Sequence, residues 1–180
     1  MKTDWIQTYT GKKFFPLKPN PADICIEDIA HSLSMQCRFA GHSKQFYSVA
    51  QHCNAMVNCW FPHPEQRELA KYALLHDASE AYLTDIPRPL KHLPEFQFYR
   101  KAKKRLTEMI YIKFGLNPVE PDEIKKADWE ILCEEAMSPR IMSPLHPDWT
   151  AKCEPLISFS ECPPEKAERI FLENFKRLFR

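Results

Sequence analysis

The chain has 180 residues, of which 44% are hydrophobic, and its formal net charge at pH 7 is +1. This length suits one domain with a real core, and a charge so near neutral gives no support for a specific nucleic-acid partner. No apolar run approaches the roughly 20 residues that span a bilayer, the first residues lack a signal peptide's apolar core, and seven cysteines without a Cys-x-x-Cys pair predict free thiols in the cytoplasm.

The chain opens with a segment, over about residues 1–22, that we expect to be irregular apart from a short hairpin around residues 9–15. The first predicted helix is Ile26–Met35, because its apolar residues recur at helical spacing. A loop is expected over residues 37–47. The second helix is predicted to begin at Ser48, since Ser48 and Gln51 have the spacing of a capping box.

Three more helices are predicted in the second and third quarters of the chain. One covers about residues 64–83, where a proline at the start suits the first helical turn. The next covers about residues 95–114, and its run of basic residues at 100–105 is expected to be a solvated helix face. The third begins near residue 122 and carries apolar residues at helical spacing.

The C-terminal part is predicted to be a proline-dotted loop over residues 138–164 followed by a last helix over residues 165–179. Apart from the hairpin, every predicted element is a helix. The sequence therefore predicts an all-α fold in a single domain over residues 1–180, with its core at about residues 23–135 and the C-terminal loop and helix at 138–180.

Four ionisable residues lie on or beside the apolar stripes of these helices: His52, His76, Asp77 and Asp128. Such groups are costly to bury unless something compensates them, and one shared divalent cation would compensate all four. Taken alone, His52 is more often a core histidine with one hydrogen bond, and Asp128 equally suits a buried cap or a salt bridge. The adjacent pair His76 and Asp77, with Glu80 one turn further on, favours the metal hypothesis.

Two imidazoles and two carboxylates leave coordination positions open for water or substrate, as catalytic metal sites do. Mixed nitrogen and oxygen ligands suit one divalent transition metal, such as cobalt, manganese, zinc, iron or nickel, better than magnesium. Magnesium is then expected only on the phosphates of a substrate. Such a metal can lower the pKa of a bound water molecule and polarise a phosphoryl oxygen.

The spaced pattern His52, His76-Asp77 and Asp128 resembles the HD-domain metal-dependent phosphohydrolases. Three longer strings narrow the resemblance: RFAGH at 38–42, YSVAQH at 47–52 and HDASEAYLTDIPRPLK at 76–91. They are similar to a small single-domain branch that includes bacterial 5′-deoxynucleotidases and phage deoxyadenosine-triphosphate phosphohydrolases. The resemblance covers about residues 23–135.

This resemblance implies a helical HD-domain bundle and an enzyme that hydrolyses deoxynucleoside 5′-phosphates, mono- or triphosphates, with dAMP and dATP favoured. It also implies a homo-oligomer. By position it assigns the role of metal ligand to His52, His76, Asp77 and Asp128. Glu80 is implied to be the proton carrier and Asp85 a catalytic or sugar-contacting aspartate. The implied phosphate-contacting cations are Arg38, Lys91 and Lys125. Phe39 stands where relatives often have the tryptophan beside the nucleoside, so it is the expected substrate wall.

Two other functions stay open on the sequence. One is hydrolysis of a signalling nucleotide, but two-metal diester chemistry in related enzymes uses extra ligands, and only His31 and His92 remain unassigned near the motifs. The other is a non-catalytic metal or nucleotide sensor, which the presence of Glu80 disfavours. Simpler interpretations also stay open for residues that only the resemblance assigns to the site: Arg38 and Lys125 as solvated charges, and Phe39 as a core side chain.

Overall fold

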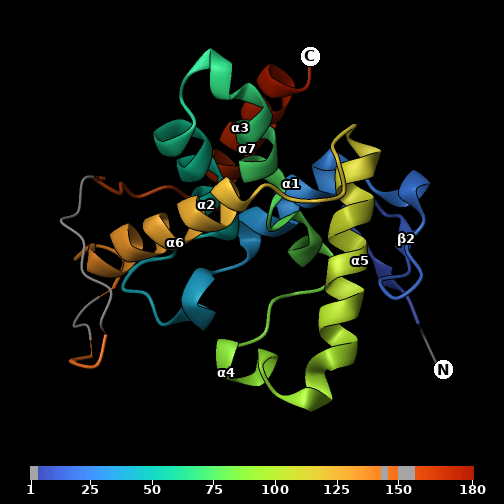
Figure 1. Cartoon of the computed structure of the whole chain (residues 1–180), viewed down its shortest axis with the longest axis horizontal. Coiled ribbons are helices and arrows are strands. Elements are labelled where there is room, and N and C mark those ends of the chain that lie inside the picture. Colours follow the sequence, from blue (N-terminus) through green and yellow to red (C-terminus); the bar gives the residue numbers. More distant parts are fainter. Residues whose placement is uncertain (1–3, 143–145, 150–156) are drawn as a thin grey trace.

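The computed structural model of the protein describes residues 4–142, 146–149 and 157–180, and helices dominate this part of the chain (Figure 1). The predicted all-α class is confirmed. The strands in the described part, β1 (Ile6–Gln7) and β2 (Lys13–Phe14), form one antiparallel pair. The expected hairpin is therefore present. The turn between its two strands is closed by backbone hydrogen bonds of Thr8 with Gly11 and Lys12.

Four helices that are far apart in the sequence pack together: α1 (Ile26–Met35), α2 (Val49–Ala55), α3 (Arg67–Leu75) and α7 (Pro164–Leu178). The C-terminal helix α7 packs against the other three, and Figure 1 shows it behind α3. The apolar faces predicted for these segments form one core, since their aliphatic residues are almost completely buried. Burial of these faces is the main force that holds the bundle together.

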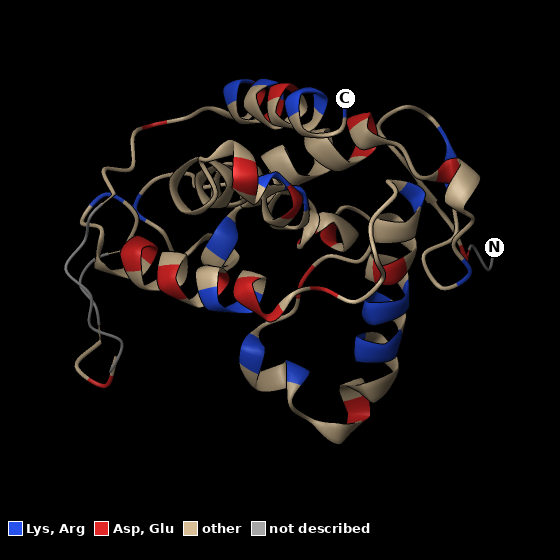
Figure 2. Ribbon diagram, turned by 45° about the horizontal axis from the view of Figure 1, so that its top comes forward, with Lys and Arg blue, Asp and Glu red and all other residues tan. Residues whose placement is uncertain are grey.

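Three further α-helices pack outside this group: α4 (Arg88–Lys91), α5 (Gln97–Lys113) and α6 (Asp122–Met137). The bounds of α5 and the start of α6 agree with the prediction to within two residues, whereas the short helix α4 was not predicted. In Figure 1, α5 extends away from the bundle towards α4 at its N-terminal end, and α6 crosses in front of α2. Figure 2 shows Lys and Arg on α4 and α5, while acidic and basic residues are mixed along α6.

The prediction of one continuous helix over residues 64–83 is wrong. The segment consists of a 3-10 turn Pro64–Gln66, the α-helix α3 ending at Leu75, and a second 3-10 turn, η5 (Ala78–Ala81). The chain bends at His76 and Asp77, between the two helices. Asp is a poor residue for a helix interior, because its short side chain prefers polar partners near the backbone, and here its carboxylate turns towards His76.

The loop predicted over residues 37–47 contains a short turn, η2 (Arg38–Gly41), in which Phe39 and Ala40 have positive φ angles of 56° and 51°. An isolated antiparallel β-bridge between the backbones of Cys37 and Ser48 closes this loop. The predicted capping box at Ser48 and Gln51 is confirmed, with both hydrogen bonds formed. Beyond α2 the same helix continues as a π-helical turn, η3 (Met56–Trp60).

Part of the predicted loop over residues 138–164 lies outside the described residues, and so does Cys153. The six cysteines of the described part carry free thiols, as predicted. Over the residues that the structure describes, none of the helices combines the length and the apolar character needed to cross a bilayer.

Candidate metal centre

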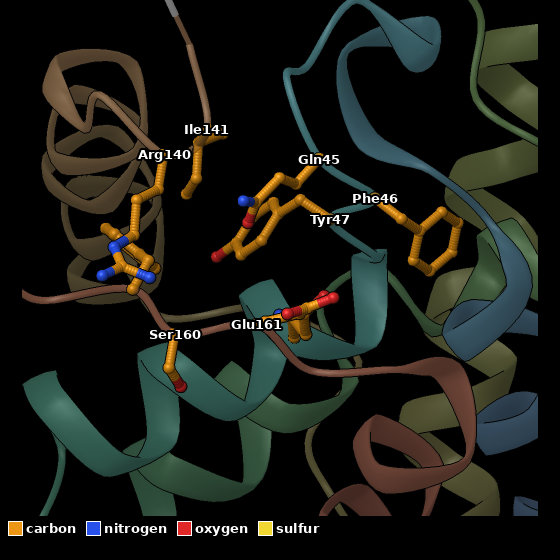
Figure 3. Close-up of a pocket in the computed structure, with 9 residues that line it drawn as sticks. Gln45, Phe46, Tyr47, Arg140, Ile141, Ser160 and Glu161 are labelled. Carbon is orange, nitrogen blue, oxygen red and sulfur yellow. The ribbon is translucent and has the colours of Figure 1, made fainter.

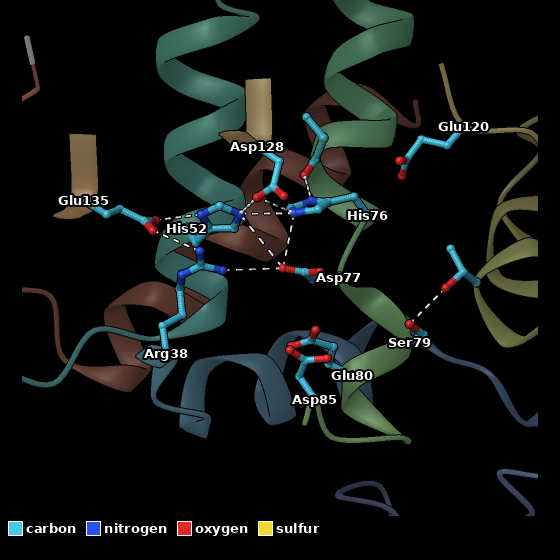
Figure 4. Close-up of polar contacts among 12 residues, drawn as sticks. Arg38, His52, His76, Asp77, Ser79, Glu80, Asp85, Glu120, Asp128 and Glu135 are labelled. Atoms are coloured by element: carbon cyan, nitrogen blue, oxygen red, sulfur yellow. Dashed lines mark hydrogen bonds and ion pairs between the residues drawn. The ribbon is translucent and has the colours of Figure 1, made fainter. Parts of the chain in front are cut away.

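The two predicted histidine ligands face each other (Figure 4). His52, on α2, is completely buried, and its Nε2 lies 3.1 Å from Nε2 of His76 at the end of α3. Each imidazole is fixed through its other nitrogen. His52 Nδ1 lies 2.6 Å from Oε1 of Glu135, and His76 Nδ1 lies 2.8 Å from the carbonyl oxygen of Ala73.

These partners determine which nitrogens carry protons. A carbonyl oxygen and a carboxylate can only accept a hydrogen bond, so Nδ1 of each ring is the donor. A neutral imidazole has a single N–H, so when both rings are neutral their Nε2 atoms present lone pairs to each other. Two lone pairs at 3.1 Å repel each other, so these facing nitrogens need either a metal ion or a proton between them.

Two carboxylates complete the cluster from different elements. Asp77, at the bend before η5, places Oδ2 3.2 Å from His76 Nε2 and 3.9 Å from His52 Nε2. Asp128, on α6, places Oδ1 3.1 Å from His52 Nε2 and 3.9 Å from His76 Nε2. The Asp128 side chain is 47% exposed, so it lies on the open side of an otherwise buried cluster.

The separations of these atoms fit a single transition-metal ion. Ligand atoms of His52, His76 and Asp77 all lie within 4.8 Å of one another, and this group can hold a metal ion. With metal–nitrogen bonds of about 2.0–2.1 Å, cis ligands are separated by about 2.9–3.4 Å. The spacing of the two imidazole nitrogens lies inside that interval. Three or four protein ligands leave positions for a water and a substrate oxygen.

Glu80 lies beside the cluster, in η5, and its side chain is almost completely buried (Figure 4). Burial raises the pKa of its carboxyl to about 7, with a further contribution from the negative charge of Asp77. The ammonium of Lys103 lies 2.6 Å from Glu80 and 2.9 Å from Asp85, and it opposes this rise. A carboxyl with a pKa near neutrality is suited to moving protons at physiological pH.

Arg38 joins the cluster to the strained turn η2. Its Nη2 donates to Oε2 of Glu135 at 2.9 Å, and its Nη1 lies 3.7 Å from Oδ2 of Asp77. The guanidinium also stands over the ring of Phe39, 5.5 Å from the ring centre. Arg38 Nε is a buried donor that has no acceptor among the described residues, and such an orphaned donor is costly unless a ligand oxygen accepts from it.

The remaining predicted phosphate contacts divide into two groups. Lys91, on α4, pairs with Asp85 at 2.5 Å and so belongs to the same charged network as Glu80 and Lys103. Lys125 is 70% exposed on α6 and pairs with Asp122 instead. The structure thus brings Lys91 near the cluster and does not bring Lys125 into contact with it, and the role of Lys125 stays a prediction.

Two residues of the site were missed by sequence reasoning. Lys103 was counted in the basic run 100–105, expected to be solvated, yet its side chain is only 19% exposed whereas that of Lys104 is 79% exposed. Glu135 follows Asp128 by two helical turns, among buried residues of α6. An acidic residue at that spacing on an apolar stripe is the signal that could have identified it.

A separate pocket is lined by Tyr47 and by residues that include Gln45, Arg140 and Ser160 (Figure 3). Its volume is about 10 Å³, which is room for about one water molecule. None of the metal-cluster residues lines it, so it has no part in the site described above.

The fold and the cluster together define a mostly helical protein with a candidate metal centre formed by His52 of α2 and by His76 and Asp77, which lie between α3 and η5. No known protein-family model matches the chain. The chain is 45% identical over 135 residues to the uncharacterized protein YfdR of Escherichia coli strain K12, an alignment that covers 73% of this chain and 70% of that protein. It is 35% identical over 178 residues to the uncharacterized protein RCAP_rcc00048 of Rhodobacter capsulatus, covering 95% and 81%. The chain belongs to the family of these two proteins.

Proposed function

We propose that the protein is a metal-dependent phosphohydrolase of the HD-domain type that acts on deoxynucleoside 5′-phosphates and releases the deoxynucleoside. The observation that carries this proposal is the convergence of two facing imidazole nitrogens and two carboxylates beside a third, buried carboxyl. Structural sites close their ligand shell, whereas this cluster is open on the side of Asp128.

His52, His76, Asp77 and Asp128 would hold one divalent transition-metal ion. When bound, such an ion lowers the pKa of water and stabilises negative charge on a phosphoryl oxygen. Glu80 is the proposed proton carrier, because its carboxyl has a pKa near 7 and lies one helical turn after Asp77. Lys103 holds the carboxylates of Glu80 and Asp85 in place through its ammonium.

The phosphate is proposed to bind between Arg38 and the lysines of the network. The buried Nε of Arg38, which has no acceptor among the described residues, would donate to a phosphate oxygen. Lys91 would add a second positive charge from α4. Cations fixed in position stabilise the charge that develops as the phosphorus–oxygen bond breaks.

Phe39 supports a preference for deoxyribose. Its ring lies directly beside Arg38 and carries no hydrogen-bonding group. An apolar wall next to C2′ disfavours a ribonucleotide, because the extra hydroxyl would be buried without a partner. We therefore expect kcat/KM for deoxynucleotides to exceed that for ribonucleotides by at least about tenfold.

Steady-state kinetics on dAMP, dATP, AMP and ATP, with added Co²⁺ or Mn²⁺, test the proposal. Hydrolysis of dAMP or dATP with release of deoxyadenosine, abolished by a chelator, is the expected result. Equal kcat/KM for the ribo and deoxy forms would overturn the sugar preference. Inactivity on all four would overturn the substrate class and favour a signalling nucleotide. The structure gives that alternative no second set of metal ligands from the two unassigned histidines, because His31 pairs with Glu168 and His92 is exposed just after α4.

A further inference from the structure

The carboxylate of Glu135 is completely buried in α6, where nothing in the proposed reaction requires a charge. It accepts three hydrogen bonds: from His52 Nδ1 at 2.6 Å, from Arg38 Nη2 at 2.9 Å and from the Tyr47 hydroxyl at 2.9 Å. Burying a carboxylate is costly, and three donors offset that cost only if the geometry is maintained. Such an arrangement fixes the side chains that donate to it.

The first consequence concerns His52. Because Nδ1–H of His52 donates its hydrogen bond to Glu135 Oε1, the neutral ring presents its Nε2 lone pair to the cluster. In the opposite tautomer, Nε2 would carry the proton and could not bind a cation. The interaction of a carboxylate with the distal nitrogen of a ligand histidine also makes the ligating nitrogen more basic.

The second consequence concerns Arg38. The other oxygen of the same carboxylate, Oε2, accepts from Arg38 Nη2, and Arg38 Nη1 then lies near Asp77 Oδ2. One buried carboxylate therefore orients both a proposed metal ligand and a proposed phosphate contact. Arg38 lies in turn η2, 97 positions before Glu135 in the chain, so this tertiary contact helps to fix its position relative to α6.

We propose that Glu135 is a positioning residue that holds His52 as a metal ligand and Arg38 beside Asp77, through one buried carboxylate shared between them. This inference rests on the proposed metal site and names a residue that the proposed reaction does not include. Glu135 acts through its two neighbours, since its oxygens are occupied by Tyr47, His52 and Arg38 and do not face the cluster.

Glu135→Gln tests the proposal with little change of shape. A glutamine offers one accepting oxygen, so its NH₂ group must face a donor on either His52 or Arg38. We expect the affinity for Co²⁺, measured by titration with visible absorption or calorimetry, to fall by about 10–100-fold. Affinity equal to that of the wild-type protein, in a folded Glu135→Gln variant, would overturn the proposal.

Asp28→Asn is a matched control. Asp28 is also a buried carboxylate with three donors, namely Thr10 N, Thr10 Oγ1 and Cys25 Sγ, but it lies on α1 and does not contact the cluster. Its neutralisation should lower stability and leave Co²⁺ affinity within about twofold, as expected for distant sites. An equal loss of affinity in both variants would mean that general destabilisation, and not the role of Glu135, reduces metal binding.

A measurement on the wild-type protein alone keeps the proposal testable if Glu135→Gln does not fold. Nitrogen-15 NMR of the imidazoles in chelator-treated protein should show a proton on Nδ1 of His52, as the hydrogen bond to Glu135 requires. A His52 ring without a proton on Nδ1 would overturn the proposal. Direct metal binding is independent of turnover, so a protein that binds Co²⁺ in a Glu135-dependent way but hydrolyses no nucleotide contradicts the proposed function alone. Wild-type protein that binds no metal contradicts both.

Discussion

Glu80 is the residue on which the proposed chemistry depends most directly. Its carboxyl has a pKa of about 7, so it loses its proton as the pH rises through neutrality. If the deprotonated form accepts the proton of the attacking water, kcat/KM should rise with pH through that region. Glu80→Gln should keep the metal, because Glu80 is outside the ligand set, and lower kcat by roughly 10²-fold or more. Parallel metal analysis and pH-dependent kinetics check this. Wild-type kcat in a metal-replete Glu80→Gln protein would remove it from the mechanism.

Lys103 allows a second test at the scale of one residue. Its ammonium lowers the pKa of Glu80, so Lys103→Met should raise that pKa. The rising limb of the pH profile of kcat/KM should therefore move to higher pH. Lys104→Met is the matched control, since Lys104 is the next residue of α5, is exposed and pairs with Glu108. A profile that moves equally in both variants, or in neither, contradicts the assignment of Lys103.

The histidines and aspartates of the cluster could be predicted from sequence because ionisable groups on apolar stripes stand out in a one-dimensional pattern. Whether four such groups share one point could not, because that depends on tertiary packing. The burial of Lys103 also could not be predicted from the sequence. It lies in a basic run that looks uniformly solvated, and only the packing of α5 against η5 decides which of the lysines is buried.

At the scale of elements, the turn η2 carries backbone strain next to Arg38. Phe39 and Ala40 both have left-handed backbone angles, which cost of order 1–3 kcal/mol each for residues other than glycine. Ala40 is exposed, so its side chain gains little from packing. The strain persists because it is held by the contacts of Arg38 and by the bridge between Cys37 and Ser48.

Ala40→Gly should relieve this strain and raise the free energy of unfolding by about 1 kcal/mol. Ala102→Gly, in the interior of α5, is the opposite control and should lower it by about 1 kcal/mol or more. Denaturant unfolding measures both. A destabilised Ala40→Gly protein would show that the left-handed angle at this position carries no strain.

The break between α3 and η5 also belongs to this scale. Residues 64–83 contain no proline or glycine after the first position, so the periodic pattern predicts a continuous helix. The chain bends at His76 and Asp77 instead, and both side chains then point into the cluster from the bend. The low helix propensity of Asp77 is too weak to reveal such a bend by itself, because the bend also depends on the polar contacts that the two residues make with α2 and α6.

At the scale of the whole molecule, the cluster joins segments that are separated by up to 76 positions in the chain, from His52 on α2 to Asp128 on α6. The hydrophobic core fixes the directions of these helices, and the core was predictable from the apolar stripes. The relative placement of α5 and α6 was not, since it depends on contacts between segments with no sequence relation to each other.

Because these elements meet only in the folded protein, a metal ion bound there should stabilise the entire fold. At a free Co²⁺ concentration 100 times its dissociation constant, the added stability is about 2.7 kcal/mol, which corresponds to a rise in Tm of roughly 5–11 °C for a chain of this size. Chelation should reverse the rise, and calorimetric or fluorescence melting measures it.

Two variants make this last measurement specific. His76→Ala removes a nitrogen ligand and should abolish the rise in Tm, because the remaining groups no longer form a site. Asp122→Ala removes an exposed carboxylate of the same helix as Asp128, one that pairs only weakly with Lys125 at the surface, and should leave the rise intact. A wild-type Tm that stays constant while direct titration shows Co²⁺ bound would mean that the ion binds elsewhere, at groups that the unfolded chain offers equally well.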